Sequence, residues 1–389
     1  MVKRARPAWV EIDLDAFEEN FRKIKALVRP GTMVTGVIKA DAYGHGAVEI
    51  GKVLLDQGVD RFAVATLSEA VQLRKVFKSV PILILGYTPT YGADELIENE
   101  IIQTMYNVDE ARIFSARAEK LGKTLKVHIK IDSGMSRLGF QATEDSVDKI
   151  MEISKLPYIE IEGMFTHFAV ADEIDKAYTY GQYEKYKFMV DALKARGLEI
   201  PVKHVSNSAA IMDLPEMNLD MVRAGIILYG LYPSNEVIKD RIDLKQVMSL
   251  KAEISHVKEL EAGRGVSYGL KYVTPGLRKI ATIPIGYADG FTRMLSGKAE
   301  VLVKGKKVPV VGRICMDQCL IDVTGIDVKI GDEVVLFGSD GKNTISIDEV
   351  AAKLGTINYE ITCMINKRIP REYTRDGKTV KTVDYLMYL

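Results

Sequence analysis

Lys39 occupies a position where a lysine could carry out covalent chemistry. It follows a mostly apolar run, Val34–Ile38, which is typical of a buried parallel strand, and it precedes a turn that contains Tyr43 and Gly44. Most lysines at such positions are surface residues, because the long side chain lets the ammonium reach water. A buried lysine instead has a lowered pKa, which makes its amine available for Schiff-base formation. The glycine and tyrosine downstream favour a functional site here.

Other side chains with acid, base or anion-binding chemistry also stand at the ends of apolar runs. They are Lys39 and Tyr43, Lys130, Asp132 and Arg137, His167, the segment His204–Ser208, and the segment Arg223–Ile226. The carboxyl ends of the strands of a parallel barrel form one rim, where functional residues gather. We therefore expect these residues to share one rim.

The elements that must position these residues alternate regularly between strand and helix. Eight β-rich runs are separated by stretches of helical period: Met33–Ile38, Arg61–Ala65, Ile82–Leu85, Gln103–Tyr106, Lys126–Asp132, Ile161–Phe168, Val202–Val205 and Met221–Ile227. This pattern predicts an α/β chain with a (β/α)8 TIM-type barrel at residues 12–240, whose first helix is capped by Asp15. A doubly wound open sheet is the alternative, but no G-x-G-x-x-G motif opens its first helix.

Residues 241–389 have a different pattern. Short β-rich runs are separated by turn signals such as Pro275-Gly276 and Asp340-Gly341, and two short helical stretches follow within residues 347–368. A mostly antiparallel β domain is predicted. The N-terminal strand, residues 1–11, is expected to join this domain, because the barrel is already complete with eight strands.

The composition excludes several classes of protein. The 389 residues carry 53 basic and 53 acidic side chains, so net charge gives no case for binding nucleic acid or an anionic membrane. No apolar run is long enough to span a bilayer, and the N-terminus lacks the apolar core of a secretory signal. Three cysteines and five scattered histidines suggest neither a disulfide framework nor a metal site. We expect a cytoplasmic protein with no metal.

Eight motifs along the whole chain resemble those of the alanine racemases, which are pyridoxal-phosphate enzymes of fold type III. They are GVIKADAYGHG at 36–46, KIDSGMSRLGF at 130–140, THFA at 166–169, HVSNSAA at 204–210, VRAGIILYG at 222–230, SYG at 267–269, PIGYADGF at 284–291 and GRICMDQ at 312–318. Each motif is weak alone, whereas eight in the right order on both predicted domains are specific.

The resemblance implies a pair of opposed proton carriers. Lys39 would hold pyridoxal 5'-phosphate covalently and then act as the base on one face of the substrate. Tyr268, contributed by the partner subunit of a head-to-tail homodimer, would act on the other face. A free tyrosine has a pKa near 10 and is a poor base at neutral pH. His167 would hydrogen-bond this tyrosine, and Arg223 would contact both His167 and the pyridine nitrogen of the cofactor.

The same resemblance assigns residues that bind the cofactor phosphate and the substrate. The phosphate would be bound by Tyr43, Ser208, Gly225, Ile226 and Tyr359. Asn207 would either assist or make a local turn with its own backbone. Arg137 and the backbone amide of Met316 would bind the substrate carboxylate. Lys130 matches a lysine that is often carbamylated in this family, and a chloride could fill the same role.

A substrate corridor is also implied, and its residues are Asp172, Tyr287, Arg293, Arg313 and Ile357. Tyr287 and Tyr359 would form a constriction that admits a methyl side chain and disfavours bulky ones. A hydrophobic pocket discriminates by only about 1–3 kcal/mol per methylene.

The function implied is an isomerase that interconverts L-alanine and D-alanine and supplies D-alanine for peptidoglycan. A racemase of broader specificity for serine or lysine, or a fold type III decarboxylase, is the alternative enzyme. A pyridoxal-phosphate carrier is the non-enzymatic alternative, but such carriers usually consist of the barrel alone.

Overall fold

The computed structural model describes residues 5–387 and divides into two compact units. One unit comprises Glu18–Ala42 and Ala47–Lys245. The other comprises the residues up to Phe17, Tyr43–Gly46, and the residues from Gln246 onward. The segment Thr35–Gly46 is therefore shared, with Lys39 in the first unit and Tyr43 in the second.

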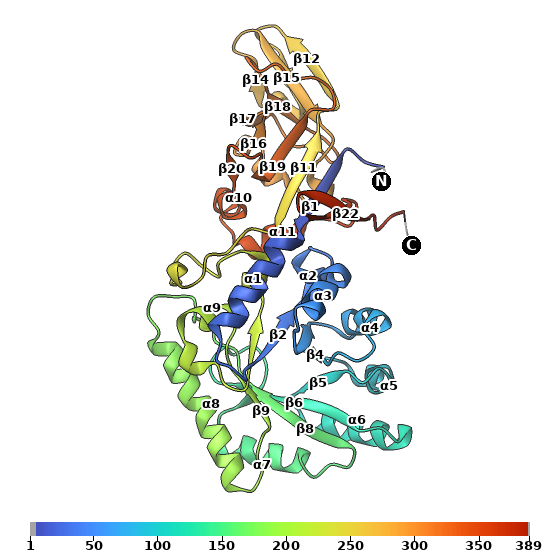
Figure 1. The fold of residues 1–389 in the computed structure, drawn as a ribbon, viewed down its shortest axis with the longest axis vertical. Helices are drawn as coiled ribbons and strands as arrows, with labels where there is room; N and C mark the ends of the chain where they lie inside the picture. Colours follow the sequence, from blue (N-terminus) through green and yellow to red (C-terminus); the bar gives the residue numbers. More distant parts are fainter. Residues whose placement is uncertain (1–4, 388–389) are drawn as a thin grey trace. The chain divides into compact units, whose positions relative to one another are not determined.

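The first unit is a parallel barrel surrounded by helices (Figure 1). Its eight strands, in spatial order, are β10 (Met221–Ala224), β2 (Met33–Val37), β3 (Arg61–Val64), β4 (Ile82–Ile84), β5 (Ile102–Met105), β6 (Leu125–Asp132), β8 (Ile159–Phe165) and β9 (Val202–His204). Backbone hydrogen bonds from Asp220 to Lys203 and from Arg223 to Ser206 link β10 to β9. All eight predicted runs form barrel strands, which confirms the predicted fold class for this unit.

Helices follow the strands as the period of the sequence predicts. They are α1 (Leu14–Leu27), α3 (Ala47–Asp56), α4 (Leu67–Val76), α5 (Ala93–Glu98), α6 (Val108–Leu121), α7 (Glu144–Ile153), α8 (Ala177–Ala195) and α9 (Ser208–Asp213). Two of them, α5 and α9, have only six residues each, which is too few to show a clear helical period. A short strand, β7 (Phe140–Gln141), pairs with β6.

The predicted cap of the first helix is wrong by two residues. Asp13, not Asp15, accepts hydrogen bonds from the backbone amides of residues 15 and 16. The helix begins at Leu14, directly after β1 (Ala8–Asp13), so that Asp13 is the residue with a side chain able to reach the first free amides.

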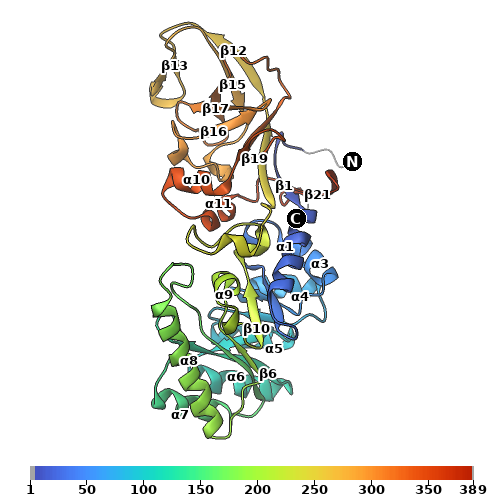
Figure 2. The ribbon, with the colours of Figure 1, turned by 60° about the vertical axis from the view of Figure 1, so that its left-hand side comes forward.

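The second unit is built on strands that run mostly antiparallel (Figure 2). Its main strands, in spatial order, are β12 (His256–Leu260), β15 (Arg278–Ile283), β18 (Cys319–Asp322), β17 (Lys306–Val311), β16 (Glu300–Val303), β19 (Glu333–Ser339), β11 (Met248–Glu253), β1, β21 (Arg371–Arg375) and β22 (Lys378–Val383). Three short strands complete it: β13 (Gly265–Val266), β14 (Tyr272–Val273) and β20 (Thr344–Ile345). Helices α10 (Ile347–Leu354) and α11 (Asn358–Met364) match the two predicted helical stretches.

The N-terminal strand β1 lies in this unit. β1 pairs antiparallel with β11 and parallel with β21. Residues 1–4 of the predicted strand lie outside the described residues. Among residues 5–387, no helix is long and apolar enough to cross a bilayer, and no cluster of three His, Cys, Asp or Glu side chains could hold a metal ion.

Candidate active site

The turn that carries Lys39 is conformationally strained. Lys39 is half-buried and begins the short helical turn α2 (Lys39–Tyr43). Ala40, Asp41 and Ala42 adopt left-handed φ values of 51°, 53° and 54°. Each such residue costs roughly 1–2 kcal/mol. Asp41 Oδ1 accepts the Ala47 amide at 2.8 Å, which helps to hold the turn. Strain of this kind persists where the surrounding structure fixes the backbone, and it occurs most often at functional sites.

Positive charge concentrates around His167 at the carboxyl ends of the barrel strands. Burial lowers the pKa of His167 well below its usual value, and Arg223, Arg137, Lys130 and Lys39 lower it further. The His167 ring is therefore uncharged at neutral pH. The structure thus brings together the residues predicted to follow strands β2, β6, β8 and β10, and a cluster of cations on this rim is suited to bind an anionic ligand.

Arg223 lies at the centre of this cluster, inside the barrel, and is 3% exposed. Its Nη2 donates to the carbonyls of Thr166 and Val205 at 2.9 Å and 3.0 Å. The guanidinium also lies over the Phe165 ring, 5.3 Å from its centroid. Burial lowers the pKa of Arg223 to about 10, so the residue remains a cation at neutral pH.

The contact between Arg223 and His167 fixes the tautomer of the histidine. Arg223 Nη2 lies 3.2 Å from His167 Nδ1. A guanidinium can only donate, so His167 Nδ1 must accept and the ring proton must reside on Nε2. His167 can therefore donate from Nε2 to a further group, such as a phenolate oxygen.

Lys130 is a buried amine that loses its proton more readily than an ordinary lysine. It is 3% exposed, and Nζ donates to the Ile131 carbonyl at 2.8 Å. Burial and the nearby charge of Arg223 lower the pKa of Lys130 to about 7. A substantial fraction of the amine is therefore neutral at pH 7, the form that reacts with carbon dioxide.

This burial predicts how stability depends on pH. The pKa of Lys130 is about 10.5 in the unfolded chain and lower when folded, so the unfolded state binds more protons and stability rises from pH 7 to pH 10. In carbon dioxide-free buffer, Lys130→Met should raise the free energy of unfolding at pH 7 by about 3–5 kcal/mol and flatten this rise. Urea denaturation of cofactor-free protein across this range measures both effects.

A surface lysine of the same unit provides the control. Lys52→Met removes a half-exposed lysine of α3 that pairs with Glu49. It should leave the slope of the unfolding free energy against pH unchanged. Equal slopes in wild type and Lys130→Met would contradict the predicted burial of a titrating amine.

The predicted phosphate-binding residues of the barrel meet at one turn. Ser208 begins α9, and its Oγ accepts the Gly225 amide at 3.0 Å. Ile226 begins the 3-10 helix η3 (Ile226–Tyr229), so its amide has no partner within that helix. Asn207 caps α9 by accepting the Ala210 amide at 3.0 Å. Of its two predicted roles, the structure therefore shows the local turn.

Tyr268 lies in a strained loop of the second unit and is 70% exposed. Ser267, Gly269 and Leu270 have φ values of 61°, 70° and 47°. A side chain at Gly269 would approach Arg313 Nη1 to 2.9 Å, so the loop packs closely against the predicted corridor residue Arg313. The barrel rim and Tyr268 thus belong to different units.

Four other predicted residues of the second unit lie in two pairs. The ring centroids of Tyr43 and Tyr359 are 6.1 Å apart, and burial raises the pKa of Tyr43. Tyr287 and Met316 lie on adjacent backbones, because the amides of residues 287 and 288 donate to the carbonyls of residues 315 and 316. Arg293 and Ile357 are exposed in this unit. Asp172 is half-buried in the barrel unit.

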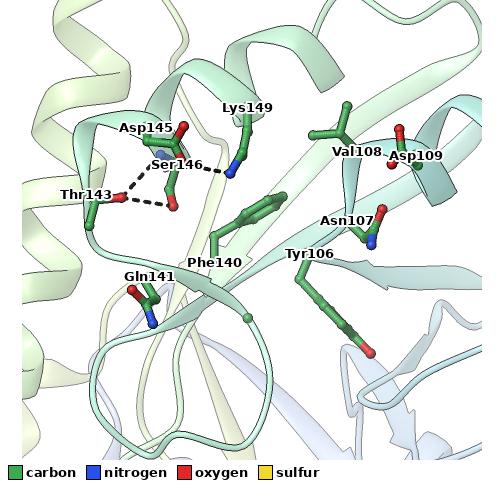
Figure 3. Close-up of a pocket in the computed structure, with 11 residues that line it drawn as sticks. Tyr106, Asn107, Val108, Asp109, Phe140, Gln141, Thr143, Asp145, Ser146 and Lys149 are labelled. Carbon is green, nitrogen blue, oxygen red and sulfur yellow. Dashed lines mark hydrogen bonds and ion pairs between the residues drawn. The ribbon is translucent and has the colours of Figure 1, made fainter.

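A cavity of about 370 Å³ is lined by the segment that follows β5, by β7 and by the first turns of α7 (Figure 3). Several of its polar side chains already bond within the barrel unit. Asp145 pairs with Lys149 at 2.6 Å, Thr143 accepts the Ser146 amide, and Asn107 caps α6. The cavity is therefore not a candidate for the chemistry of the rim.

Sequence reasoning placed His204, which contacts Arg223 inside the barrel, at the end of an apolar run and within a quoted motif. It missed two further residues, the buried His128 and the half-buried Glu162, which belong to no quoted motif. The alternation of polar and apolar residues in β6 and β8 was the available signal, because it places ionisable side chains in otherwise apolar strands.

Comparison with known proteins identifies the family. The family profile "Alanine racemase, N-terminal domain" matches residues 12–233, and "Alanine racemase, C-terminal domain" matches residues 247–373. An alanine racemase of Clostridium perfringens is 52% identical over 382 residues, which cover 98% of this chain and 99% of that one. The chain belongs to the alanine racemase family.

Solved structures of the family agree with this fold. The alanine racemase of Clostridium difficile 630 superposes with a TM-score of 0.96 at 52% identity, covering 99% of this chain and 100% of that one. A histidine racemase of Leuconostoc mesenteroides superposes with a TM-score of 0.89 at 30% identity, covering 96% and 99%. The chain is thus an isomerase of the racemase class, and its fold also occurs in an enzyme named for a larger substrate.

The barrel rim fits the cofactor on which the alanine racemase family depends, pyridoxal 5'-phosphate. The test is the chemistry of the donors: Lys39 supplies a half-buried amine, and Ser208 and the start of η3 offer a hydroxyl and a free amide to a phosphate. Arg137, Lys130 and Arg223 add positive charge to the same rim. These groups match a ligand with an aldehyde and a phosphate dianion.

Proposed function

We propose that this chain interconverts L-alanine and D-alanine by two-base proton transfer, with Lys39 and Tyr268 as the catalytic residues. The observation that carries the proposal is the Arg223–His167 contact, which leaves a neutral histidine donor beside Lys39 on a cationic rim. A racemase must remove a proton from one face of Cα and return one to the other. It therefore needs two groups that can each hold that proton.

Pyridoxal 5'-phosphate, when bound, would stabilise the negative charge that develops at Cα. Lys39 would attach the cofactor, and Ser208, Gly225, Ile226, Tyr43 and Tyr359 would bind its phosphate. Arg223 would face the ring nitrogen and, because a guanidinium keeps its protons, would disfavour protonation there. Lys39 Nζ would exchange a proton with one face of Cα.

Tyr268 Oη would exchange the proton on the opposite face. His167 supports this role, because its Nε2–H can donate to the phenolate and lower the cost of deprotonating Tyr268. Arg137 and the Met316 amide would bind the substrate carboxylate. A carbamate on Lys130 would place an anion near Arg137, and the low pKa of Lys130 supports that modification.

The exposure of Tyr268 supports a homodimer with shared sites. Tyr268, Leu270 and Met316 are 70%, 62% and 52% exposed, and each of these side chains has a large apolar surface. We infer that a partner subunit covers this surface and that Tyr268 completes the partner's site. The corridor of Asp172, Tyr287, Arg293, Arg313 and Ile357, a cytoplasmic location and a supply of D-alanine to peptidoglycan remain predictions.

One incubation tests the reaction. With pyridoxal phosphate and L-alanine in heavy water, we expect Cα deuteration together with loss of optical rotation. Carbon dioxide release would instead indicate a decarboxylase, and cofactor binding without exchange would indicate a carrier. Parallel incubations with L-serine, L-lysine and L-histidine test the broader-specificity alternative, which the histidine racemase of the same fold keeps open.

A further inference from the structure

Two buried histidines and a glutamate extend the contacts of Arg223 away from the rim and through the barrel. Arg223 Nη1 lies 2.9 Å from His204 Nδ1, and His204 Nε2 lies 2.8 Å from His128 Nδ1. His128 Nε2 lies 2.9 Å from Glu162 Oε2. We call Arg223, His204, His128 and Glu162 the buried chain. Both histidines are 0% exposed, so water does not reach their rings, whereas the Glu162 side chain at the end is 15% exposed.

The chemistry at the two ends fixes the direction of every hydrogen bond. Arg223 can only donate, so His204 Nδ1 accepts and His204 carries its proton on Nε2. His204 Nε2–H then donates to His128 Nδ1. His128 therefore carries its proton on Nε2 and donates to Glu162 Oε2, which as a carboxylate can only accept. Both histidines are neutral Nε2–H tautomers.

Arg61 creates a competing arrangement that Glu162 suppresses. Arg61 Nη1 lies 3.3 Å from His128 Nε2 and 2.7 Å from Glu162 Oε2. If Arg61 donated to His128 Nε2, the proton of His128 would move to Nδ1. Every hydrogen bond of the buried chain would then reverse its direction. His204 Nδ1–H would then face the N–H of Arg223, and this last hydrogen bond would be lost. With Glu162 present, Arg61 and His128 both donate to the same carboxylate oxygen instead.

The protonation states of these residues agree with the hydrogen-bond directions derived above. Burial alone would raise the pKa of Glu162, but hydrogen bonds from His128 and Arg61 hold it well below its usual range. Burial and the charge of Arg223 keep the pKa of His204 well below its usual value, and burial also lowers that of His128. The buried chain therefore joins one cation and one anion through two neutral rings.

Packing holds the two rings in place. Gly163 is required next to Glu162, because a Cβ there would lie 2.6 Å from His128 Cε1. Phe165, two residues further along β8, stacks on His204 with ring centroids 4.7 Å apart and planes 9° apart. The other oxygen of Glu162 accepts from Lys126 Nζ at 3.1 Å, and both residues line a cavity of about 330 Å³.

We propose that Glu162 is a positioning residue for Arg223: as the terminal acceptor of the buried chain, it fixes the tautomers of His128 and His204 and thereby keeps His204 Nδ1 an acceptor for Arg223. The inference deepens the proposed function and rests on it for the effect on rate. The hydrogen-bond directions depend only on residues of this protein and not on the proposed function.

Nitrogen-15 NMR of histidine tests the directions without using activity. The chain has five histidines, so selective labelling gives few ring signals. In wild type we expect neutral Nε2–H rings at His128 and His204, each assigned by its absence from a His→Gln variant. Glu162→Leu should move the proton of both rings to Nδ1, and Glu162→Gln, which keeps an acceptor oxygen, should leave both at Nε2.

Kinetics of the cofactor-loaded enzyme test the consequence. Loss of the Arg223–His204 bond should lower kcat of Glu162→Leu by about 10–100-fold with little change in KM, because small displacements of catalytic groups have effects of this size. Glu162→Gln should retain most of the activity. Asp213→Asn is the matched control: Asp213 is a buried carboxylate that likewise pairs with a lysine, Lys176 at 2.8 Å, but touches no member of the buried chain. It should change neither kcat nor the tautomers.

The outcomes separate the two proposals. A wild-type spectrum with Nδ1–H or doubly protonated rings at His128 or His204 overturns the inference without any variant, even if Glu162→Leu does not fold. Unchanged tautomers and kcat in Glu162→Leu also overturn it. If wild type does not racemise alanine, the proposed function fails, but the spectra still decide the hydrogen-bond directions.

Discussion

Lys39→Ala is expected to abolish racemisation in both directions, with kcat lower by at least about 10⁴-fold. The variant removes the amine that would attach the cofactor and act as one of the two bases. The barrel should remain folded, because Lys39 is half-buried and follows the end of β2. Chiral chromatography of alanine measures the rates, and mass spectrometry after borohydride reduction detects the covalent pyridoxal adduct.

Two controls test whether the loss of activity is specific to the Lys39 amine. Lys52→Met, on α3 of the same unit, should racemise alanine normally. A small primary amine added to Lys39→Ala should restore part of the activity, because it replaces the missing functional group. A variant that lacks the adduct yet retains more than a few per cent of wild-type kcat would refute the assignment of Lys39.

Tyr268→Phe is expected to lower kcat from L-alanine by about 10²–10⁴-fold while leaving cofactor binding intact. The change removes the phenolic oxygen and keeps the ring. The face served by Lys39 should still lose its Cα proton, so deuterium exchange should become strongly unequal between the two enantiomers. Proton NMR of each enantiomer in heavy water measures this inequality.

Tyr272→Phe is the matched control in the same loop region. The Tyr272 hydroxyl donates to Asp322 Oδ2 at 3.0 Å, so its loss should cost about 1 kcal/mol of stability and leave racemisation unchanged. Normal turnover of both enantiomers by Tyr268→Phe would refute the two-base mechanism.

A mixture of the two inactive variants tests the shared site. In a head-to-tail dimer, the mixed species combines Lys39 of one subunit with Tyr268 of the other and so contains one intact site. After refolding or subunit exchange, random pairing should restore about a quarter of wild-type activity. No restoration, with mixed dimers demonstrated by mass spectrometry, would mean that Tyr268 acts within its own chain.

Local pattern was sufficient to predict much of this fold. The eight barrel strands, the five long helices between them and the short strands after residue 241 follow from the period of apolar residues, which records which face each element buries. The N-cap of α1 was placed two residues late, because β1 leads directly into the helix and only hydrogen-bond geometry distinguishes Asp13 from Asp15.

The sequence by itself determined the candidate chemistry, since Lys39, His167, Arg223 and Tyr268 lie in recognisable motifs. Only the tertiary structure decided what supports them. Glu162 and His128 are 34 positions apart, and His128 and His204 are 76 apart. They meet because β6, β8 and β9 are neighbours in the barrel, with β10 hydrogen-bonded to β9. No local pattern encodes such a contact, because its energy comes from burying paired polar groups that only barrel closure brings together.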